Sequence, residues 1–105
     1  VIALMAVTVG PRVTEVERRL FAENRYTDYL FLHGLGVESA EALAEYIHRQ
    51  IRAEMGIGGD DAREIPKLFH QRYRGSRYSF GYPACPNLED QEKLLRVLKP
   101  ERIGI

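Results

Sequence analysis

Cysteine is almost absent from this chain, which has Cys85 alone among 105 residues. One thiol cannot form an internal disulfide, and by itself it cannot supply the several thiolates of a structural zinc site. Disulfides accumulate in oxidising compartments, so their exclusion favours the cytoplasm as the expected location. We expect Cys85 to be a small buried thiol rather than a nucleophile.

The chain also lacks an excess of charge, since 15 Lys and Arg residues balance 15 Asp and Glu residues. Proteins dedicated to nucleic acids or membrane surfaces usually carry clear positive charge, so neither partner is expected. No apolar run is long enough for a membrane span, and no basic-then-apolar signal segment opens the sequence. The length predicts one domain.

Both ends of the sequence are apolar. It opens with VIALMAVTV, without an initiator methionine, and stops at RIGI. Nearly continuous apolar stretches are typical of buried strands. We therefore predict strands at residues 1–9 and 103–105, and we interpret the chain as a piece of a longer polypeptide.

Two helices are predicted after the first apolar stretch. Thr14 and Glu17 have capping-box spacing, which predicts the start of a first helix. Apolar residues then recur at helical intervals from Thr27 onwards. Gly34 and Gly36 interrupt this pattern, and we favour one long helix with a close-packing notch over two helices.

The C-terminal half shows further helix signals. The stretch GIGGDD is typical of a helix end followed by a turn, and residues 62–73 could form a short helix. Residues 76–86 are expected to be an extended loop. Asn87 predicts the N-cap of a last helix, which ends before Pro100.

Glu45-x-x-His48, with Glu41 one turn earlier, has the spacing found in carboxylate-bridged metal sites. Such sites need the motif twice and two further glutamates, and here it occurs once. We therefore expect a solvated helix face rather than a metal site.

Basic and aromatic residues alternate in residues 67–82, which contain no acid. Such a pattern could stack single-stranded nucleic acid, giving a non-catalytic RNA- or partner-binding module as one hypothesis. Core aromatics mixed with solvated arginines are the other interpretation, and the neutral net charge favours it.

The stretch SRYSFGYPACP, residues 76–86, suggests a preorganised ligand loop. Gly81 permits close approach of a ligand, and Pro83 and Pro86 restrict the backbone. Arg77 could pair bidentately with a carboxylate, and the aromatic rings could stack on a purine or a cation. S-adenosylmethionine carries all of these groups.

The pattern Arg77-x-x-x-Gly81-Tyr82-Pro83-Ala84-Cys85-Pro86 resembles the signature of the S-adenosylmethionine-binding activation domain of cobalamin-dependent methionine synthase. The stretches ALMAVTVG, AEALAEYIHRQIR and LLRVLKPERIGI resemble that family in the same order. The resemblance covers residues 1–105 as part of one such domain, and the family's domain extends beyond both ends.

This resemblance implies a function and partners. In that family, S-adenosylmethionine remethylates inactive cob(II)alamin in a one-electron reduction, so that the methyltransferase can again make methionine. Cobalamin would be bound by a neighbouring domain of the same enzyme, and a flavodoxin-like reductant would supply the electron. A stand-alone S-adenosylmethionine-binding protein is the narrower alternative.

The resemblance also implies site residues and a fold. Arg77 would hold the ligand carboxylate, backbone groups around Ser79 and Gly81 would line the ligand, and Tyr82 would shape the turn or the adenine pocket. Glu41 would favour the sulfonium or the ammonium group, and an exposed helix acid is its alternative role. The implied fold is α+β, with helices packed on a curved, mainly antiparallel sheet. The cobalamin-binding Asp-x-His-x-x-Gly pattern and the cysteines of a zinc site are absent from the sequence.

Overall fold

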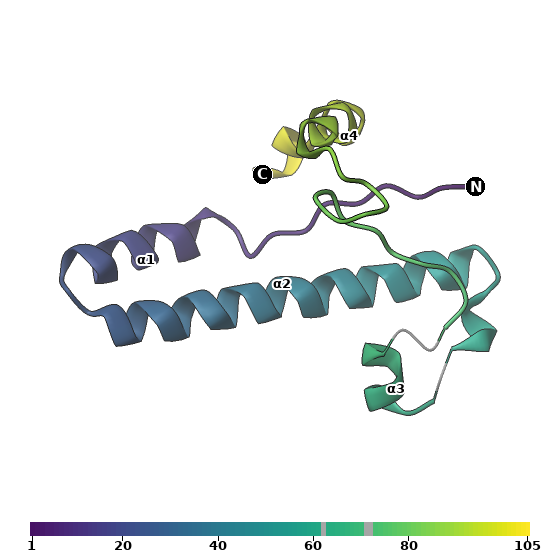
Figure 1. The fold of residues 1–105 in the computed structure, drawn as a ribbon, viewed down its shortest axis with the longest axis horizontal. Helices are drawn as coiled ribbons and strands as arrows, with labels where there is room; N and C mark the ends of the chain where they lie inside the picture. Colours follow the sequence, from purple (N-terminus) through teal and green to yellow (C-terminus); the bar gives the residue numbers. More distant parts are fainter. Residues whose placement is uncertain (62, 71–72) are drawn as a thin grey trace.

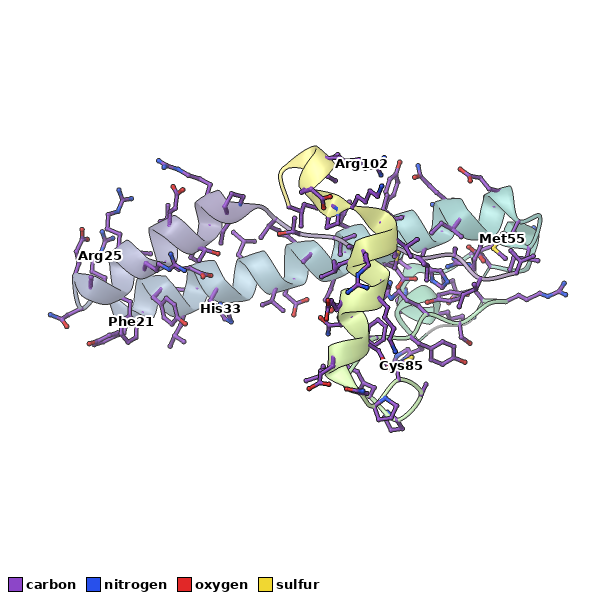
Figure 2. All side chains as sticks on the ribbon, turned by 90° about the horizontal axis from the view of Figure 1, so that it is seen from above. Phe21, Arg25, His33, Met55, Cys85 and Arg102 are labelled. Carbon is purple, nitrogen blue, oxygen red and sulfur yellow. The ribbon has the colours of Figure 1, made fainter. Side chains whose placement is uncertain are left out.

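The computed structural model describes residues 1–61, 63–70 and 73–105. Its helices are α1 (Pro11–Ala22), α2 (Tyr26–Glu54), α3 (Ile65–Phe69) and α4 (Gln91–Leu98), with short 3₁₀ helices η1 (Gly58–Asp60), η2 (Leu88–Asp90) and η3 (Pro100–Ile103). α1 lies antiparallel along the first half of α2 (Figure 1). α4 crosses the direction of α2 steeply when the molecule is seen from above (Figure 2).

The expected α+β fold is wrong, because the described residues form helices and no strand. Residues 1–9 run as irregular chain past α2, with no backbone hydrogen bond to another described segment (Figure 1). A strand requires a neighbour that pairs with its N–H and C=O groups, and apolar composition alone does not supply one. The curved antiparallel sheet is therefore not a feature of the described chain.

The second expected strand, at residues 103–105, is also wrong. Pro100 begins η3, since its fixed φ suits the first position of a helix. Gly104 ends η3 in the left-handed region, with a φ of 78°. η3 therefore takes in Ile103, and Gly104 and Ile105 follow it without forming a strand.

α1 begins at Pro11, so the start predicted from Thr14 and Glu17 lies inside the helix and is wrong. Gly10, at a φ of 88°, precedes it without a side-chain cap. After α1, Asn24 adopts a φ of 58°. This left-handed residue turns the chain into α2.

The prediction of one long helix with a glycine notch is confirmed by α2. A Cβ at Gly36 would lie 3.4 Å from the Val13 Cγ1 atom, in ordinary van der Waals contact, so α1 passes close to α2 at this point and leaves no room for a larger side chain. Gly34 faces open space, and Gly56, at a φ of 76°, follows the helix end. Although α2 has 29 residues, no helix of the described chain is both long and apolar enough to cross a bilayer.

The later helix predictions are partly confirmed. α3 covers only Ile65–Phe69 of the expected helix at 62–73, of which Ala62 and residues 71–72 lie outside the described chain. Asn87 is the predicted cap, since its Oδ1 atom accepts a hydrogen bond of 3.0 Å from the Glu89 N–H. The helical run that it opens ends at Leu98, just before Pro100.

The apolar core is small. Leu20 and Ala44 are the buried apolar residues of the described chain, whereas His48 and Arg52 are buried polar residues. The radius of gyration is 16.4 Å, compared with about 13 Å for a compact domain of roughly this length. Among the described residues the most buried is Arg52, a charged residue on the second half of α2.

Candidate functional site

Arg77, the predicted carboxylate contact, lies against two glutamates of α2. Its Nη1 atom donates a hydrogen bond of 3.1 Å to Glu45 Oε2, and its Nη2 atom lies 3.6 Å from Glu41 Oε2. The side chains of Arg77 and Glu45 are 19% and 23% exposed, whereas that of Glu41 is 68% exposed. Glu41 and Glu45 share a helix face because they are one turn apart. The fold thus brings the predicted residues Arg77 and Glu41 together.

The other predicted site residues follow in the loop. The Gly81 N–H donates a hydrogen bond of 2.8 Å to the Cys85 carbonyl, and the Cys85 N–H donates one of 2.9 Å to the Tyr82 carbonyl. Ser79 and Tyr82 are exposed, and Cys85 is half-buried rather than buried. Among the described contacts, no hydrogen bond or ion pair joins Ser79 or Tyr82 to Arg77. The loop is a tight turn closed by its own backbone.

A cluster around Arg52, here called the Arg52 cluster, contains Arg52, Asp61, His48 and Tyr73. Asp61 accepts two hydrogen bonds from the Arg52 guanidinium, at 3.2 Å from Nε and 2.7 Å from Nη2. The Arg52 Nη1 atom lies 2.9 Å from His48 Nδ1. The guanidinium carbon lies 3.8 Å from the centre of the Tyr73 ring, a cation–π contact. Four different contacts therefore hold one buried cation.

Ionisation in the Arg52 cluster follows from burial and from these contacts. Burial lowers the pKa of His48, and the charges of Arg52 and Arg77 lower it further. His48 is therefore neutral at physiological pH, so its Nδ1 atom can accept the Arg52 hydrogen bond. The hydrogen bond from Arg52 lowers the pKa of Asp61. Burial raises the pKa of Tyr73, and the Glu45 carboxylate raises it further.

The segment that leads to Arg77 is anchored along α2. Tyr73 packs on Arg52, and the His48 ring meets Tyr73 edge-on at 5.2 Å between ring centres. Between Tyr73 and Arg77, Gly75 has a φ of 92°, and a Cβ there would lie 3.4 Å from the Arg52 Cδ atom. The contacts of Tyr73, Gly75 and Arg77 with α2 set the position from which the loop at residues 76–86 starts.

The expectation of a solvated face around Glu45-x-x-His48 is wrong. His48 is 7% exposed, and the two side chains serve Arg52 and Arg77. Within the described chain, no three acidic, histidine or cysteine residues are grouped as metal ligands. Sequence reasoning missed Arg52, Asp61 and Tyr73. A usable signal was the stripe of charged and histidine residues at positions 41, 45, 48 and 52, which repeats at helical intervals along α2.

The basic aromatic segment at 67–82 does not form one uniform surface. Arg77 is already paired with acids, and Tyr73 is half-buried on Arg52. Tyr78 and Tyr82 are 67% and 68% exposed. Arg72 lies outside the described residues. The segment therefore offers exposed rings, while Arg77 lies against the acids of α2 rather than on a surface shared with those rings.

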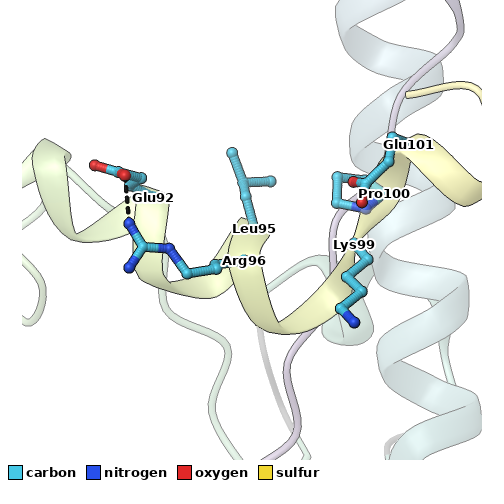
Figure 3. A pocket seen from close by; sticks show the side chains of 6 residues that line it. All are labelled: Glu92, Leu95, Arg96, Lys99, Pro100 and Glu101. Carbon is cyan, nitrogen blue, oxygen red and sulfur yellow. Dashed lines mark hydrogen bonds and ion pairs between the residues drawn. The ribbon is translucent and has the colours of Figure 1, made fainter.

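An open depression of about 470 Å³ lies between α4 and η3 (Figure 3). Its lining residues are Glu92, Leu95, Arg96, Lys99, Pro100 and Glu101. The Arg96 Nη2 atom lies 2.6 Å from Glu92 Oε1, so the two charges are paired with each other. None of the predicted ligand residues lines this depression, and we place the candidate site at Arg77 instead.

Comparison with known proteins agrees with the loop signature. The family model for the activation domain of vitamin B12-dependent methionine synthase matches residues 1–105. Methionine synthases of Mycobacterium tuberculosis (strain ATCC 25618 / H37Rv) and Mycobacterium leprae (strain TN) are 48% and 45% identical over 111 aligned residues. Each alignment covers 100% of this chain and 9% of the relative, so the chain spans less than a tenth of those enzymes. The chain therefore belongs to the family of activation domains of vitamin B12-dependent methionine synthases.

Proposed function

We propose that this chain is part of the S-adenosylmethionine-binding activation domain of a cytoplasmic cobalamin-dependent methionine synthase, a methyltransferase. The observation that carries the proposal is the position of Arg77. Its guanidinium is held between Glu45 and Glu41 of α2. It lies at the start of a loop whose Gly81–Cys85 turn is closed by backbone hydrogen bonds.

The groups around Arg77 fit the amino-acid end of S-adenosylmethionine. The Arg77 Nη2 atom is beyond hydrogen-bond distance of Glu41, at 3.6 Å, so this edge of the guanidinium can donate hydrogen bonds to the carboxylate of the ligand. The exposed Glu41 carboxylate can attract the ammonium or sulfonium group. A cation beside an exposed anion is complementary to a ligand that carries both signs of charge.

The loop fits the remainder of the ligand. Gly81, at a φ of 90°, leaves its backbone without a side chain. The exposed Tyr82 ring offers a flat face for adenine. In this proposal the backbone around Ser79 and Gly81 lines the ligand, and Tyr82 shapes the adenine pocket.

S-adenosylmethionine supplies a methyl group, which in this proposal serves the reactivation of cobalamin held by a neighbouring domain of the same enzyme. A flavodoxin-like protein would be the reductant. The residues of this chain bind and orient: Arg77 neutralises the carboxylate, and Glu41 balances the positive groups. The rigid turn limits the entropy lost on binding.

Calorimetric titration of S-adenosylmethionine into the full-length polypeptide tests the proposal. Arg77→Ala should weaken binding by about 1.5–3 kcal/mol, because a charge-assisted hydrogen bond to the ligand is lost. Arg96→Ala is the matched control, since Arg96 pairs with Glu92 on α4 away from the site. Unchanged affinity in Arg77→Ala would contradict the assignment.

A further inference from the structure

The two carboxylates beside Arg77 are not equivalent. Glu45 accepts a hydrogen bond of 3.1 Å from Nη1, and its side chain is 23% exposed. Glu41 lies 3.6 Å from Nη2, beyond hydrogen-bond distance, and its side chain is 68% exposed. One edge of the guanidinium is therefore fixed by a half-buried partner, and the other edge faces a loosely placed acid.

We propose that Glu45 is a positioning residue for ligand binding, which holds the Nη1 edge of Arg77 so that the Nη2 edge is presented to the ligand carboxylate. This inference rests on the proposed function of Arg77. Glu45 itself makes no contact with the ligand in this assignment, and it acts through Arg77.

Preorganisation gives the physical reason for such a role. An arginine side chain has several rotatable bonds, and its planar fork binds a carboxylate well only in the correct orientation. A guanidinium already held at one edge loses less freedom when the ligand arrives. Glu45 can hold it firmly because α2 is a continuous helix there and because the carboxylate is largely shielded from water.

Charge compensation supports the same role. Arg77 is 19% exposed and lies close enough to His48 to lower the pKa of that histidine. Without Glu45, this half-buried cation would keep only the exposed Glu41 as a partner. A poorly compensated, shielded charge tends to reorient towards water. Glu45 therefore keeps Arg77 at the surface of α2, where the loop begins.

The test uses the full-length polypeptide and two ligands, S-adenosylmethionine and its decarboxylated analogue, which lacks the carboxylate. Glu45→Ala should raise the Kd for S-adenosylmethionine about 10-fold, equivalent to roughly 1.4 kcal/mol. It should leave the Kd of the analogue unchanged within about 2-fold, because only the carboxylate contact depends on Arg77. The double variant with Arg77→Ala should bind no more weakly than Arg77→Ala alone, since residues that act as one unit are not additive.

Two further variants control for folding and charge. Glu45→Gln keeps an oxygen that can accept the Nη1 hydrogen bond, so it should restore part of the lost affinity. If thermal melting shows that Glu45→Ala does not fold, Glu45→Gln replaces it in the test. The Kd for S-adenosylmethionine should then rise about 3-fold, and the Kd for the analogue should not change. Glu92→Ala, which removes an exposed glutamate from α4, should change neither Kd.

The outcomes separate this inference from the proposed function. If the wild-type polypeptide does not bind S-adenosylmethionine, both are overturned. If it binds, and Arg77→Ala weakens binding while the Glu45 variants leave the affinity unchanged or increase it, only the positioning role is overturned. Equal weakening for both ligands, or additive effects in the double variant, would show a general structural role instead and would also overturn it.

Discussion

Arg52 is the best-buried side chain in the described part of the molecule, at 1% exposure. Burying a cation is costly, and it is tolerated only where hydrogen bonds and an opposite charge compensate for lost water. Here Asp61 supplies the charge, His48 supplies a neutral acceptor, and the Tyr73 ring covers one face. Asp61 compensates the Arg52 charge only when it is ionised, and His48 accepts the Arg52 hydrogen bond only when it is neutral. The free energy of unfolding therefore depends on pH.

His48 gives the first expected effect. The pKa of His48 is lowered from 6.5 by burial and by Arg52 and Arg77, so the unfolded chain binds a proton at higher pH than the folded chain. The free energy of unfolding should therefore be independent of His48 above about pH 6.5 and should fall as the pH drops from there towards the folded pKa. Thermal melts between about pH 7.5 and about pH 5.5 measure this.

His48→Gln is the control for that experiment, because glutamine does not titrate. The variant should lose the decline in this pH window. Asp61 does not interfere, since its lowered pKa places the loss of its contribution below its ordinary value of 3.8. An identical pH profile in wild type and His48→Gln would show that His48 contributes nothing.

Gly81 is the second position where the identity of one residue should affect stability and ligand binding. Gly81→Val should destabilise the protein by about 1–3 kcal/mol and weaken ligand binding, because a β-branched residue is strained at a φ of 90°. A Cβ there would also lie 3.0 Å from the Leu88 Cδ2 atom, although that side chain can move. Gly59→Val is the matched control, since Gly59 has open space and no positive φ. If both variants melt alike, the turn does not need a glycine.

At the scale of elements, α2 is the helix that both α1 and Arg77 contact. Along its first half it packs against α1 through the notch at Gly36. Along its second half it presents the polar stripe that holds the Arg52 cluster and Arg77. The contact with α1 and the contacts with Arg77 lie on one helix, so the position of the loop at residues 76–86 depends on the continuity of α2.

The notch predicts a helix-packing effect. Gly36→Leu should destabilise the protein by about 1–3 kcal/mol, because extra side-chain volume at a close contact forces the helices apart. The Val13 Cγ1 atom is 3.4 Å from the Cβ position at Gly36, whereas nothing lies within 4 Å of the same position at Gly34. Gly34→Leu should therefore be neutral or stabilising in chemical denaturation. Equal losses in both variants would contradict close packing at Gly36.

At the scale of the whole molecule, apolar surface is poorly covered. Phe31, Leu35, Leu30 and Val97 are between 64% and 74% exposed. Apolar exposure of this kind leaves surface that other protein can cover. The 16.4 Å radius of gyration describes the same open arrangement.

We therefore expect the isolated chain of 105 residues to self-associate, to melt with low cooperativity, or to bind S-adenosylmethionine far more weakly than the full-length polypeptide. Exposed apolar faces recruit other chains, and a core this small contributes little free energy of unfolding. Analytical ultracentrifugation and thermal melts measure both properties. A clean monomer with one sharp transition and strong ligand binding would contradict this expectation.

The features that the sequence predicted correctly depend on residues that are close together in the chain. The Asn87 cap and the end of α2 before Gly56 depend on residues close in the chain, so residue type and spacing suffice to predict them. The loop at residues 76–86 was expected to be extended, and the structure closes it into a turn at Gly81. The loop signature also depends on adjacent residues, and it identified the family that the comparison then showed.

Long-range contacts explain what the sequence could not decide. Whether residues 1–9 form a strand depends on a pairing segment, and the described chain has none. Glu45 and His48 were predicted to lie on a solvated face of α2. The fold instead brings Arg77 and Asp61 to that face. The sequence by itself determined the family and most of the helices, because these depend on neighbouring residues. The tertiary structure alone decided which charges are buried and paired, because burial and pairing depend on residues that meet only when the chain is folded.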